Sequence, residues 1–549
     1  MPYPPPLHNL RDSATSPRRL GGAGGAGWVV QRHHHPTRRR RLSNGICLES
    51  LDLEKSPALG AIRGVSEARP ERPGEAADAE PTRAAGRRFH IWTYGCQMNV
   101  HDSEKLANLL LHAGWEACEA ADQADLLLVN TCSIREKAEH RLYSDLGALR
   151  GWKGAREGRV LGVGGCVAQQ EGDALLRRFA HLDFAFGTHN LRLVPRLADA
   201  ARAGERAARV EESRSLERFD LPERHPAFPG AGRGSAFVTV MEGCDLFCAF
   251  CIVPRTRGRE ISRPAAGILA EVAALAARGV REVVLLGQTV NAYGRHDLRR
   301  GGETAAGVVP FAELLARLAG VPGIERIRYT SPHPAFFDDA LVSAHGALPA
   351  LCPHVHLPAQ SGSDRVLARM RRRYAADDLR RLAGALRAAR ADLVLTTDLI
   401  VGFPGETEED FEATLALVRD VGFVDSYSFK YSPRPGTAAA AFPDRVAPDV
   451  AQARLERLQA LQRELTLAAH RSRVGTRTEV LLEGPSPKGR GQLQGRDPYH
   501  RRVHVAAADL AVPAALAVGR LVPVEIVEAT PHALLGRPLL TQSPGAAAR

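Results

Sequence analysis

Six of the nine cysteines in this 549-residue chain fall into two groups of three. The compact triad is Cys244, Cys248 and Cys251, in a CxxxCxxC run, and the dispersed triad is Cys96, Cys132 and Cys166. Thiolates favour zinc and iron–sulfur clusters as metal partners. Because a cubane cluster has four irons, three cysteines leave one iron open to another ligand. Each triad therefore predicts a metal centre with one coordination position left for chemistry.

The remaining cysteines, Cys47, Cys118 and Cys352, follow no ligand pattern, and we expect them to be structural or incidental. Cysteine use that is sparse and clustered suits metal binding in a reducing compartment better than a secreted disulfide framework. The sequence therefore predicts a cytoplasmic protein. No apolar run approaches the ~20 residues that span a bilayer, so no membrane segment is expected.

The net charge of +11 is unevenly distributed along the chain. Residues 1–42 contain eight arginines and one aspartate, and residues 473–549 contain ten basic and six acidic residues. These two segments account for the whole positive excess. Residues 1–87 are also rich in proline and glycine and cannot build a core, so we expect a disordered basic tail there.

From Arg88 the sequence alternates between strand-like and helix-like segments. The expected strands are residues 89–93, 126–129, 160–163 and 183–186. The first helix is expected to begin at a cap on Asp102 or Ser103 and to end at Gly114. This alternation predicts an α/β domain, residues 88–204, built on a doubly wound parallel sheet.

Each cysteine of the dispersed triad comes just after one of these strands. In open α/β sheets, the loops at the carboxyl ends of the strands converge on a ligand crevice. We therefore expect the three cysteines to meet in space although they are far apart in sequence. The alternative is that each is a small buried hydrophobe at a tight corner, which is common for free cysteine.

A linker is expected at residues 205–232, and a second domain at residues 233–472. Six strands are expected in this domain, at residues 236–240, 282–286, 325–329, 354–357, 394–400 and 426–430. Helical segments separate them, and the compact triad directly follows the first strand. This order predicts a central partial (β/α)6 barrel, with its site in the loops at the strand carboxyl ends.

Polar residues follow several of the barrel strands. Gly287 and Gln288 follow the second strand, and Gln360 and Ser361 follow the fourth. Amides, a hydroxyl and glycine backbone at these places suit a polar, zwitterionic nucleoside ligand. No catalytic acid–base pair stands out in the sequence.

Two groups of residues could suggest zinc sites, but neither has the spacing of zinc ligands. His333, His354 and His356 lack ligand spacing, and histidines on strands and loops are usually structural. Zinc modules usually pair two CxxC knuckles, and no second knuckle lies near the compact triad. A cluster with an open iron fits the compact triad better.

The carboxyl-terminal part changes from helical to strand periodicity. Residues 451–471 predict an amphipathic helix with a face of leucines, Leu455, Leu458, Leu461 and Leu465. Five short strands between residues 479 and 537 predict a small β-barrel domain, residues 473–540. Its basic residues suit phosphate contacts, or alternatively form an ordinary solvated surface. They are Lys488, Arg490, Arg496, Arg501 and Arg502.

Residues 88 to about 540 resemble the methylthiotransferases, a family of radical S-adenosylmethionine (SAM) enzymes. The compact triad is similar to the cluster loop of radical SAM enzymes, and residues 473–540 resemble the TRAM domain, an RNA-binding barrel. The phrases most similar to the branch that acts on isopentenylated adenine in tRNA are Gly95-Cys96-Gln97-Met98-Asn99, Asn130-Thr131-Cys132-Ser133-Ile134-Arg135, Gly164-Gly165-Cys166-Val167-Ala168, Met241-Glu242-Gly243-Cys244, and residues 253–264.

The resemblance implies two 4Fe-4S clusters and SAM as cofactors. The dispersed triad would hold an auxiliary cluster whose open iron carries the sulfur to be methylated, and the compact triad would hold the cluster that binds SAM. Gly287, Gln288, Gln360 and Ser361 would contact SAM. The resulting radical would activate carbon 2 of N6-isopentenyladenosine beside the tRNA anticodon, which would then take up the methylthio group. The barrel and the basic loop at residues 255–263 would bind the RNA.

Two alternative functions remain open. Similar enzymes modify threonylcarbamoyl-adenosine in tRNA or an aspartate of a ribosomal protein, although the Cys-Gln-Met-Asn and Cys-Ser-Ile-Arg phrases argue against both. A non-catalytic RNA-binding protein with structural metal sites is the alternative from another class. The partners expected are tRNA and an electron donor whose identity the sequence does not give, with no membrane. We expect a monomer.

Overall fold

The computed structural model describes residues 65–66, 87–133, 136–228, 234–301, 306–487, 489 and 491–539. All of them belong to one compact unit, Leu51–Arg549. The predicted disordered tail, residues 1–87, lies outside the described residues apart from Val65, Ser66 and Arg87.

The first folded part is a seven-stranded sheet in which every pairing is parallel. Its strands are β1 (Val65–Ser66), β2 (Arg88–Tyr94), β3 (Glu116–Ala117), β4 (Leu126–Thr131), β5 (Val160–Gly165), β6 (Phe184–Phe186) and β7 (Ala207–Arg209). Phe89 of β2 pairs with β3 on one edge and with β4 on the other. The chain therefore winds outward in both directions from β2, which confirms the predicted doubly wound sheet.

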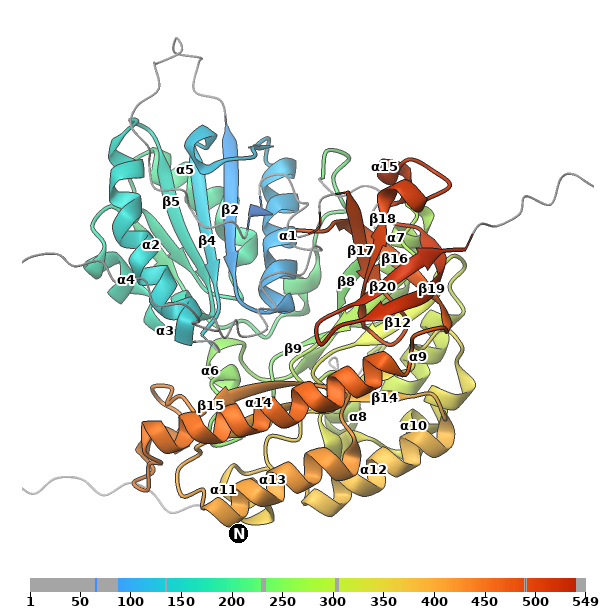
Figure 1. The fold of residues 1–549 in the computed structure, drawn as a ribbon. Coiled ribbons are helices and arrows are strands. Elements are labelled where there is room, and N and C mark those ends of the chain that lie inside the picture. Colours follow the sequence, from blue (N-terminus) through green and yellow to red (C-terminus); the bar gives the residue numbers. More distant parts are fainter. Residues whose placement is uncertain are drawn as a thin grey trace, which may run out of the picture. The chain divides into compact units, whose positions relative to one another are not determined.

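Helices cover both faces of this sheet (Figure 1). They are α1 (Gln97–His112), α2 (Glu136–Gly154), α3 (Cys166–Glu171), α4 (Asp173–Arg178) and α5 (Val194–Arg202). Leu106 of α1 and Val194 of α5 belong to one buried cluster, and Leu142 of α2 belongs to another. Because both faces are covered, the central strands are continuously apolar rather than alternating.

The start of α1 differs from the prediction. We expected Asp102 or Ser103 to cap this helix, but α1 begins directly after Cys96, so both residues lie in its second turn and are buried. The hydroxyl of Ser103 accepts a hydrogen bond from Thr93 at 2.8 Å. These side chains make tertiary contacts, which explains why capping residues occur inside a helix.

The segment predicted to be a linker, residues 205–232, contains β7 and a turn of 3-10 helix, Leu216–Phe219. Arg218 in this turn is buried and forms an ion pair with Glu242 at 3.1 Å. This segment therefore carries charge into the protein interior, which its composition alone did not indicate.

Six parallel strands form the middle part, as predicted. They are β8 (Ser235–Thr239), β11 (Glu282–Leu286), β12 (Arg326–Tyr329), β13 (His354–His356), β14 (Val394–Val401) and β15 (Asp425–Lys430). They form two three-stranded sheets, with β11 and β14 as the central strands, and a backbone bridge between Ile327 and Leu351 extends from one towards the other. A short antiparallel pair, β9 (Met241–Glu242) and β10 (Ile261–Ser262), brackets the compact triad and was not predicted.

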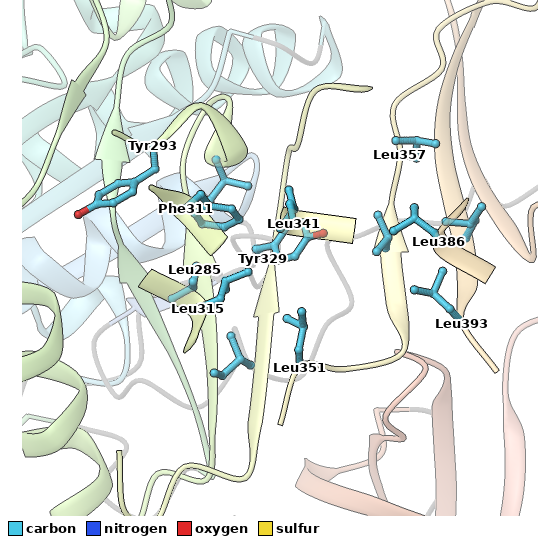
Figure 2. Close-up of a cluster of buried hydrophobic side chains, with 14 of the residues drawn as sticks. Leu285, Tyr293, Phe311, Leu315, Tyr329, Leu341, Leu351, Leu357, Leu386 and Leu393 are labelled. Carbon is cyan, nitrogen blue, oxygen red and sulfur yellow. The ribbon is translucent and has the colours of Figure 1, made fainter. Parts of the chain in front are cut away.

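The helices of the middle part are α6 (Val253–Thr256), α7 (Ala265–Ala277), α8 (Arg295–Arg300), α9 (Phe311–Ala319), α10 (Asp339–Ala347), α11 (Asp364–Arg369), α12 (Ala376–Ala389), α13 (Glu408–Val421) and α14 (Pro448–Arg471). One buried cluster runs between the strands and these helices, from Tyr293 and Phe311 to Leu386 and Leu393 (Figure 2). Burial of this continuous apolar surface is the main stabilising contribution to the barrel. Among the described residues, no helix is long and apolar enough to cross a membrane.

The carboxyl-terminal part is a closed five-stranded barrel in the order β16-β17-β18-β20-β19, as predicted. The strands are β16 (Arg477–Pro485), β17 (Gln492–Arg496), β18 (Arg502–Ala506), β19 (Leu521–Ala529) and β20 (Leu534–Pro538). Closure leaves no free strand edge along this path. Val480, Val503 and Val524 are fully buried in its core.

Candidate metal centres and cofactor site

The dispersed triad lies at the carboxyl ends of three adjacent strands. Cys96 follows β2 and precedes α1, Cys132 follows β4, and Cys166 follows β5 as the first residue of α3. Cys132 is fully buried, and Cys166 is 4% exposed. This place, where the chain winds outward from β2 and β4, is where open α/β sheets bind their ligands.

The three thiols of the dispersed triad are neighbours in space. The Cys132 thiol is hydrogen-bonded to both other cysteines and lowers the pKa of Cys96 to about 6 and that of Cys166 to about 7. The same contacts raise the pKa of Cys132. Three converging sulfurs, two of which favour the thiolate, suit a soft metal group better than three unrelated buried hydrophobes.

Backbone geometry at Gly95 allows the sulfurs to converge. Gly95 has φ +135°, and a Cβ added there would lie 2.4 Å from the Cβ of Cys132. Asn99 packs against the same glycine: the Cys96 thiol donates to Asn99 Oδ1 at 3.4 Å, and Asn99 Nδ2 donates to the Thr131 carbonyl at 3.2 Å. The Gly-Cys phrase is therefore required by close packing, not only by a turn.

The compact triad occupies the loop between β9 and α6. The backbone N–H of Cys244 donates to Gly258 O at 3.1 Å, and that of Cys251 donates to Cys248 O at 3.0 Å. The N–H of Ala249 donates to Met370 O at 2.9 Å, which ties the loop to the barrel. The loop is therefore held on both sides by the rest of the chain.

Burial disfavours a bare thiolate at the compact triad. Desolvation raises the pKa of Cys244 to about 11 and that of Cys251 to about 12. Arg372 Nη1 donates to the sulfur of Cys248 at 3.3 Å, and Thr289 Oγ1 lies 3.1 Å from that of Cys244. Buried thiols become good metal ligands when a cationic metal group compensates their charge, so the donor set fits a cluster held by three cysteines.

The predicted cofactor residues Gly287 and Gln288 lie beside the compact triad. Gln288 Oε1 accepts a hydrogen bond from the Gly243 N–H at 2.5 Å, immediately before Cys244. Its Nε2 is buried and has no hydrogen-bond partner among the described residues. A Cβ at Gly287 would lie 2.6 Å from Met241 Cγ, so only glycine fits there. The free amide N–H suits a polar ligand at this place.

Gln360 and Ser361 follow β13 and differ in how the fold uses them. Gln360 has φ +69°, a conformation that a residue with a side chain rarely adopts, and its backbone bonds to Asp398 and Ile400 of β14. The hydroxyl of Ser361 is fully buried, lies 3.3 Å from Thr414 Oγ1 and accepts from the Ser363 N–H. Ser361 thus shapes the loop through contacts within the protein.

The three histidines considered for zinc have different surroundings. His354 and His356 each contact Thr396 Oγ1 at 3.0 Å. His333 instead packs near Tyr374, and burial lowers its pKa to about 2. Across the described ranges, no group of three or more His, Cys, Asp or Glu side chains has a geometry that could hold a single metal ion.

Sequence reasoning missed two arginines at these sites. Arg372 stands between two other arginines and reads as solvated surface, but its guanidinium reaches Cys248. Arg257, in the basic loop predicted to bind RNA, is buried and pairs with Asp102 at 2.5 Å. A run of basic residues gives no signal that one member points inward, so only the structure identifies these contacts.

Two family models match the two parts that carry the triads. Residues 88–187 match a family described as uncharacterized protein family UPF0004, and residues 238–418 match the radical SAM superfamily. The first match contains the whole dispersed triad, and the second contains the whole compact triad. The chain is thus of the radical SAM class, with an added N-terminal cysteine domain.

Curated relatives narrow this class to one enzyme. The tRNA-2-methylthio-N(6)-dimethylallyladenosine synthase of Geobacter metallireducens is 49% identical over 451 residues, covering 82% of this chain and 97% of the relative. The synthase of the same name from Burkholderia ambifaria is 44% identical over 466 residues, covering 84% of this chain and 99% of the relative. The chain belongs to the family of tRNA-2-methylthio-N(6)-dimethylallyladenosine synthases.

Family membership confirms the cofactors expected from the sequence, which are SAM and two 4Fe-4S clusters. Among solved structures, the radical SAM methyltransferase TsrM from Kitasatospora setae, with cobalamin and a 4Fe-4S cluster bound, aligns with a TM-score of 0.47 at 16% identity. That alignment covers 65% of this chain and 74% of TsrM.

Proposed function

We propose that this chain adds a methylthio group to carbon 2 of N6-isopentenyladenosine beside the anticodon of tRNA. The observation that carries the proposal is that six cysteines form two separate thiol triads, each on the domain that matches its own family model. A single structural metal site would need only one of them. The relatives named above carry the same activity in their names.

The two triads have different tasks in this proposal. Cys96, Cys132 and Cys166 would hold the auxiliary cluster, and Cys244, Cys248 and Cys251 would hold the cluster that binds SAM. When bound, these groups supply the radical chemistry and the methylated sulfur. The protein's own contribution is to hold each sulfur in place and to bury it away from water, as for Cys132.

We assign the SAM contacts to the loops beside the compact triad. The unpartnered Nε2 of Gln288 would donate to the cofactor, and Gly287 would allow its close approach. Gln360, held with positive φ in the loop after the fourth barrel strand, would present its side-chain amide. Ser361 remains in the proposed site as the residue that shapes this loop.

The RNA interface is proposed more coarsely. The closed barrel at residues 473–540 would act as a TRAM-like RNA-binding domain, but Arg496 and Arg501 pair internally with Glu483 and Asp497. In the basic loop, three arginines are likewise engaged by carboxylates, which favours ion pairs within the protein over RNA contacts for these side chains. These pairs are Arg257–Asp102, Arg259–Asp245 and Arg263–Glu271. Exposed arginines such as Arg477 and Arg520 are therefore better phosphate contacts.

The remaining parts of the proposal concern the setting of the enzyme. It would work as a cytoplasmic monomer and receive electrons from a separate donor protein. Its substrate would be tRNA that already carries the isopentenyl group, not threonylcarbamoyl-adenosine or a ribosomal protein, in line with the name of the relatives.

Two measurements test this function. Anaerobic reconstitution is expected to give about eight irons per chain, and Cys132→Ala about four, because only the auxiliary cluster is lost. Nucleoside analysis of tRNA from a deletion strain should show isopentenyladenosine without its methylthio group. The intact gene should restore the methylthio group, and the gene with Cys132→Ala should not. Zinc in place of iron, or methylthiolated nucleoside persisting in the deletion strain, would overturn the proposal.

A further inference from the structure

A buried group of charged side chains lies where the domain of the dispersed triad contacts the loop of the compact triad. We call it the charge cluster; its members are Asp102, Lys105, Arg218, Glu242 and Arg257. Arg257 Nη2 lies 2.5 Å from Asp102 Oδ2, Arg218 Nη2 lies 3.1 Å from Glu242 Oε2, and Lys105 Nζ lies 3.4 Å from Glu242 Oε1. No side chain of the cluster is more than 10% exposed.

The ion pairs of the charge cluster do not balance. Three cations face two carboxylates, so one positive charge is left over in a buried place. Burying an uncompensated charge is costly, and proteins keep such charges where a partner of opposite sign is present. The imbalance therefore indicates that an anionic group belongs next to the cluster.

Arg257 also has an unused donor. Its Nη1 is buried and has no hydrogen-bond partner among the described side chains and backbone, although Arg257 is only 3% exposed. A buried guanidinium N–H without a partner loses the hydrogen bond that water would otherwise accept. Arg257 thus brings an unused donor to a cluster in which two cations, Lys105 and Arg218, share the single carboxylate of Glu242.

The surrounding elements place Arg257 near the dispersed triad, because α6, which ends directly before Arg257, contacts α3, whose first residue is Cys166. Asp102, its partner, is on α1, which starts directly after Cys96. The residues around Arg257 are fixed by hydrogen bonds from Thr188 Oγ1 to Thr256 O at 2.5 Å and between His189 Nε2 and Arg257 O at 2.9 Å.

Electrostatics agrees with this placement. The positive charge of Arg257 contributes to lowering the pKa of two thiols in the dispersed triad, Cys96 and Cys166, after the larger effect of their hydrogen bonds to Cys132. The field of Arg257 therefore reaches the sulfurs that would bind the auxiliary cluster.

We propose that Arg257 is a positioning residue for the auxiliary centre, whose buried charge and free Nη1–H stabilise the anionic group held by Cys96, Cys132 and Cys166. The inference rests on the proposed function. A cubane cluster held by three thiolates carries net negative charge, and reduction makes it more negative. Arg257 then raises the reduction potential of this centre and favours an anionic sulfur ligand at its open iron.

This role also connects the two metal centres. Arg257 follows α6, which itself follows the last cysteine of the compact triad, so one short segment carries both Cys251 and the residue that compensates the other centre. A displacement of the compact-triad loop would therefore change the electrostatic surroundings of the dispersed triad.

The test uses the full chain with Cys244, Cys248 and Cys251 replaced by alanine, so that only the auxiliary centre can bind a cluster. Iron content and the midpoint potential are measured. The midpoint potential comes from a redox titration that is monitored by electron paramagnetic resonance. Arg257→Gln should shift the potential downwards, because the reduced centre loses a neighbouring positive charge. Asp102→Asn should shift it upwards, because the charge of Arg257 is no longer offset.

Opposite shifts distinguish electrostatics from general loosening, which would move both variants the same way. Arg259→Gln is the matched control, because this arginine of the same loop is 45% exposed and pairs with Asp245; its potential should stay at the parent value. If Arg257→Gln loses its iron, the midpoint potentials of Arg257→Lys and Asp102→Asn are compared with that of the parent protein instead, and they decide whether Arg257 acts on the potential. About four irons with unshifted potentials would overturn the role of Arg257 alone, whereas no iron in the parent would overturn the proposed auxiliary site.

Discussion

At the scale of single residues, Gly95 controls whether the dispersed triad can form. A side chain there would overlap the Cβ of Cys132, at 2.4 Å, and would have to adopt φ +135°. We expect Gly95→Ala to reduce bound iron from about eight to about four per chain, because Cys96 and Cys132 can no longer approach each other. Iron analysis after reconstitution measures this directly.

Gly114→Ala is the matched control for that substitution. Gly114 also has positive φ, +80°, but a Cβ there would meet nothing within 4 Å. Both variants place an alanine at positive φ, while the overlap with a cysteine occurs only at Gly95. Equal iron loss in both would show that strain, not the approach to Cys132, causes the effect.

Some residues of the site could be predicted from the sequence, and others could not. The approach of Cys96, Cys132 and Cys166 to one another could be predicted, because each follows an apolar strand of one parallel sheet. Metal binding by the six cysteines stays a prediction. Arg257 and Asp102 were not, since 155 positions separate them and their charges read as ordinary surface or capping residues. A contact between domains leaves no local periodicity, so a single sequence gives it no signal.

At the scale of elements, α14 differs most from its sequence pattern. The predicted leucine face contributes one fully buried side chain, Leu458, while the other three leucines are partly buried. The remaining buried positions are mostly polar, including Arg454 and Gln462. Helical periodicity identified the element, but the polar residues on its inner side bond to partners that lie elsewhere in the chain.

Arg454 connects α14 to the loop that follows β14. Its Nη1 lies 2.9 Å from Glu406 Oε2, and that same oxygen accepts the Gly402 N–H at 2.6 Å. We expect Arg454→Met to lower the free energy of unfolding by about 3–5 kcal/mol, because Glu406 would remain as a buried carboxylate without its cation. Equilibrium unfolding in urea measures the loss.

Two further variants give that prediction its controls. Arg457→Met removes a neighbouring arginine whose side chain is 47% exposed and paired with Glu408 and Glu412, and should cost at most about 1 kcal/mol. Adding Glu406→Gln to Arg454→Met should recover part of the stability, because no unpaired charge then remains buried. A loss as small as that of Arg457→Met would argue against an important buried pair.

At the scale of the whole molecule, each thiol triad lies at parallel strands that could be predicted from the βα alternation, while the connections between these parts of the chain could not be predicted. The charge cluster joins the N-terminal domain to the compact-triad loop. A second connection joins β12 of the middle part to the carboxyl-terminal barrel through Arg326 and Arg328. Both use buried arginines, whose long side chains reach partners across a boundary.

The connection to the carboxyl-terminal barrel leads to a prediction about RNA binding. Arg326 donates to the carbonyls of Arg496 at 3.1 Å and Glu479 at 2.9 Å, and Arg328 donates to those of Pro498 at 2.9 Å and Asp497 at 2.7 Å.

Arg326→Met removes two of these bonds and leaves the ion pair of Arg328 with Glu282 intact. We expect faster hydrogen exchange around Glu479 and Arg496 and weaker tRNA binding, with iron content unchanged, because the carboxyl-terminal barrel is held less firmly against β12. Arg281→Met is the control: this arginine forms an exposed pair with Glu325, and neither hydrogen exchange nor tRNA affinity should change. Unchanged tRNA affinity in Arg326→Met despite faster exchange would mean that the barrel binds RNA without a fixed orientation.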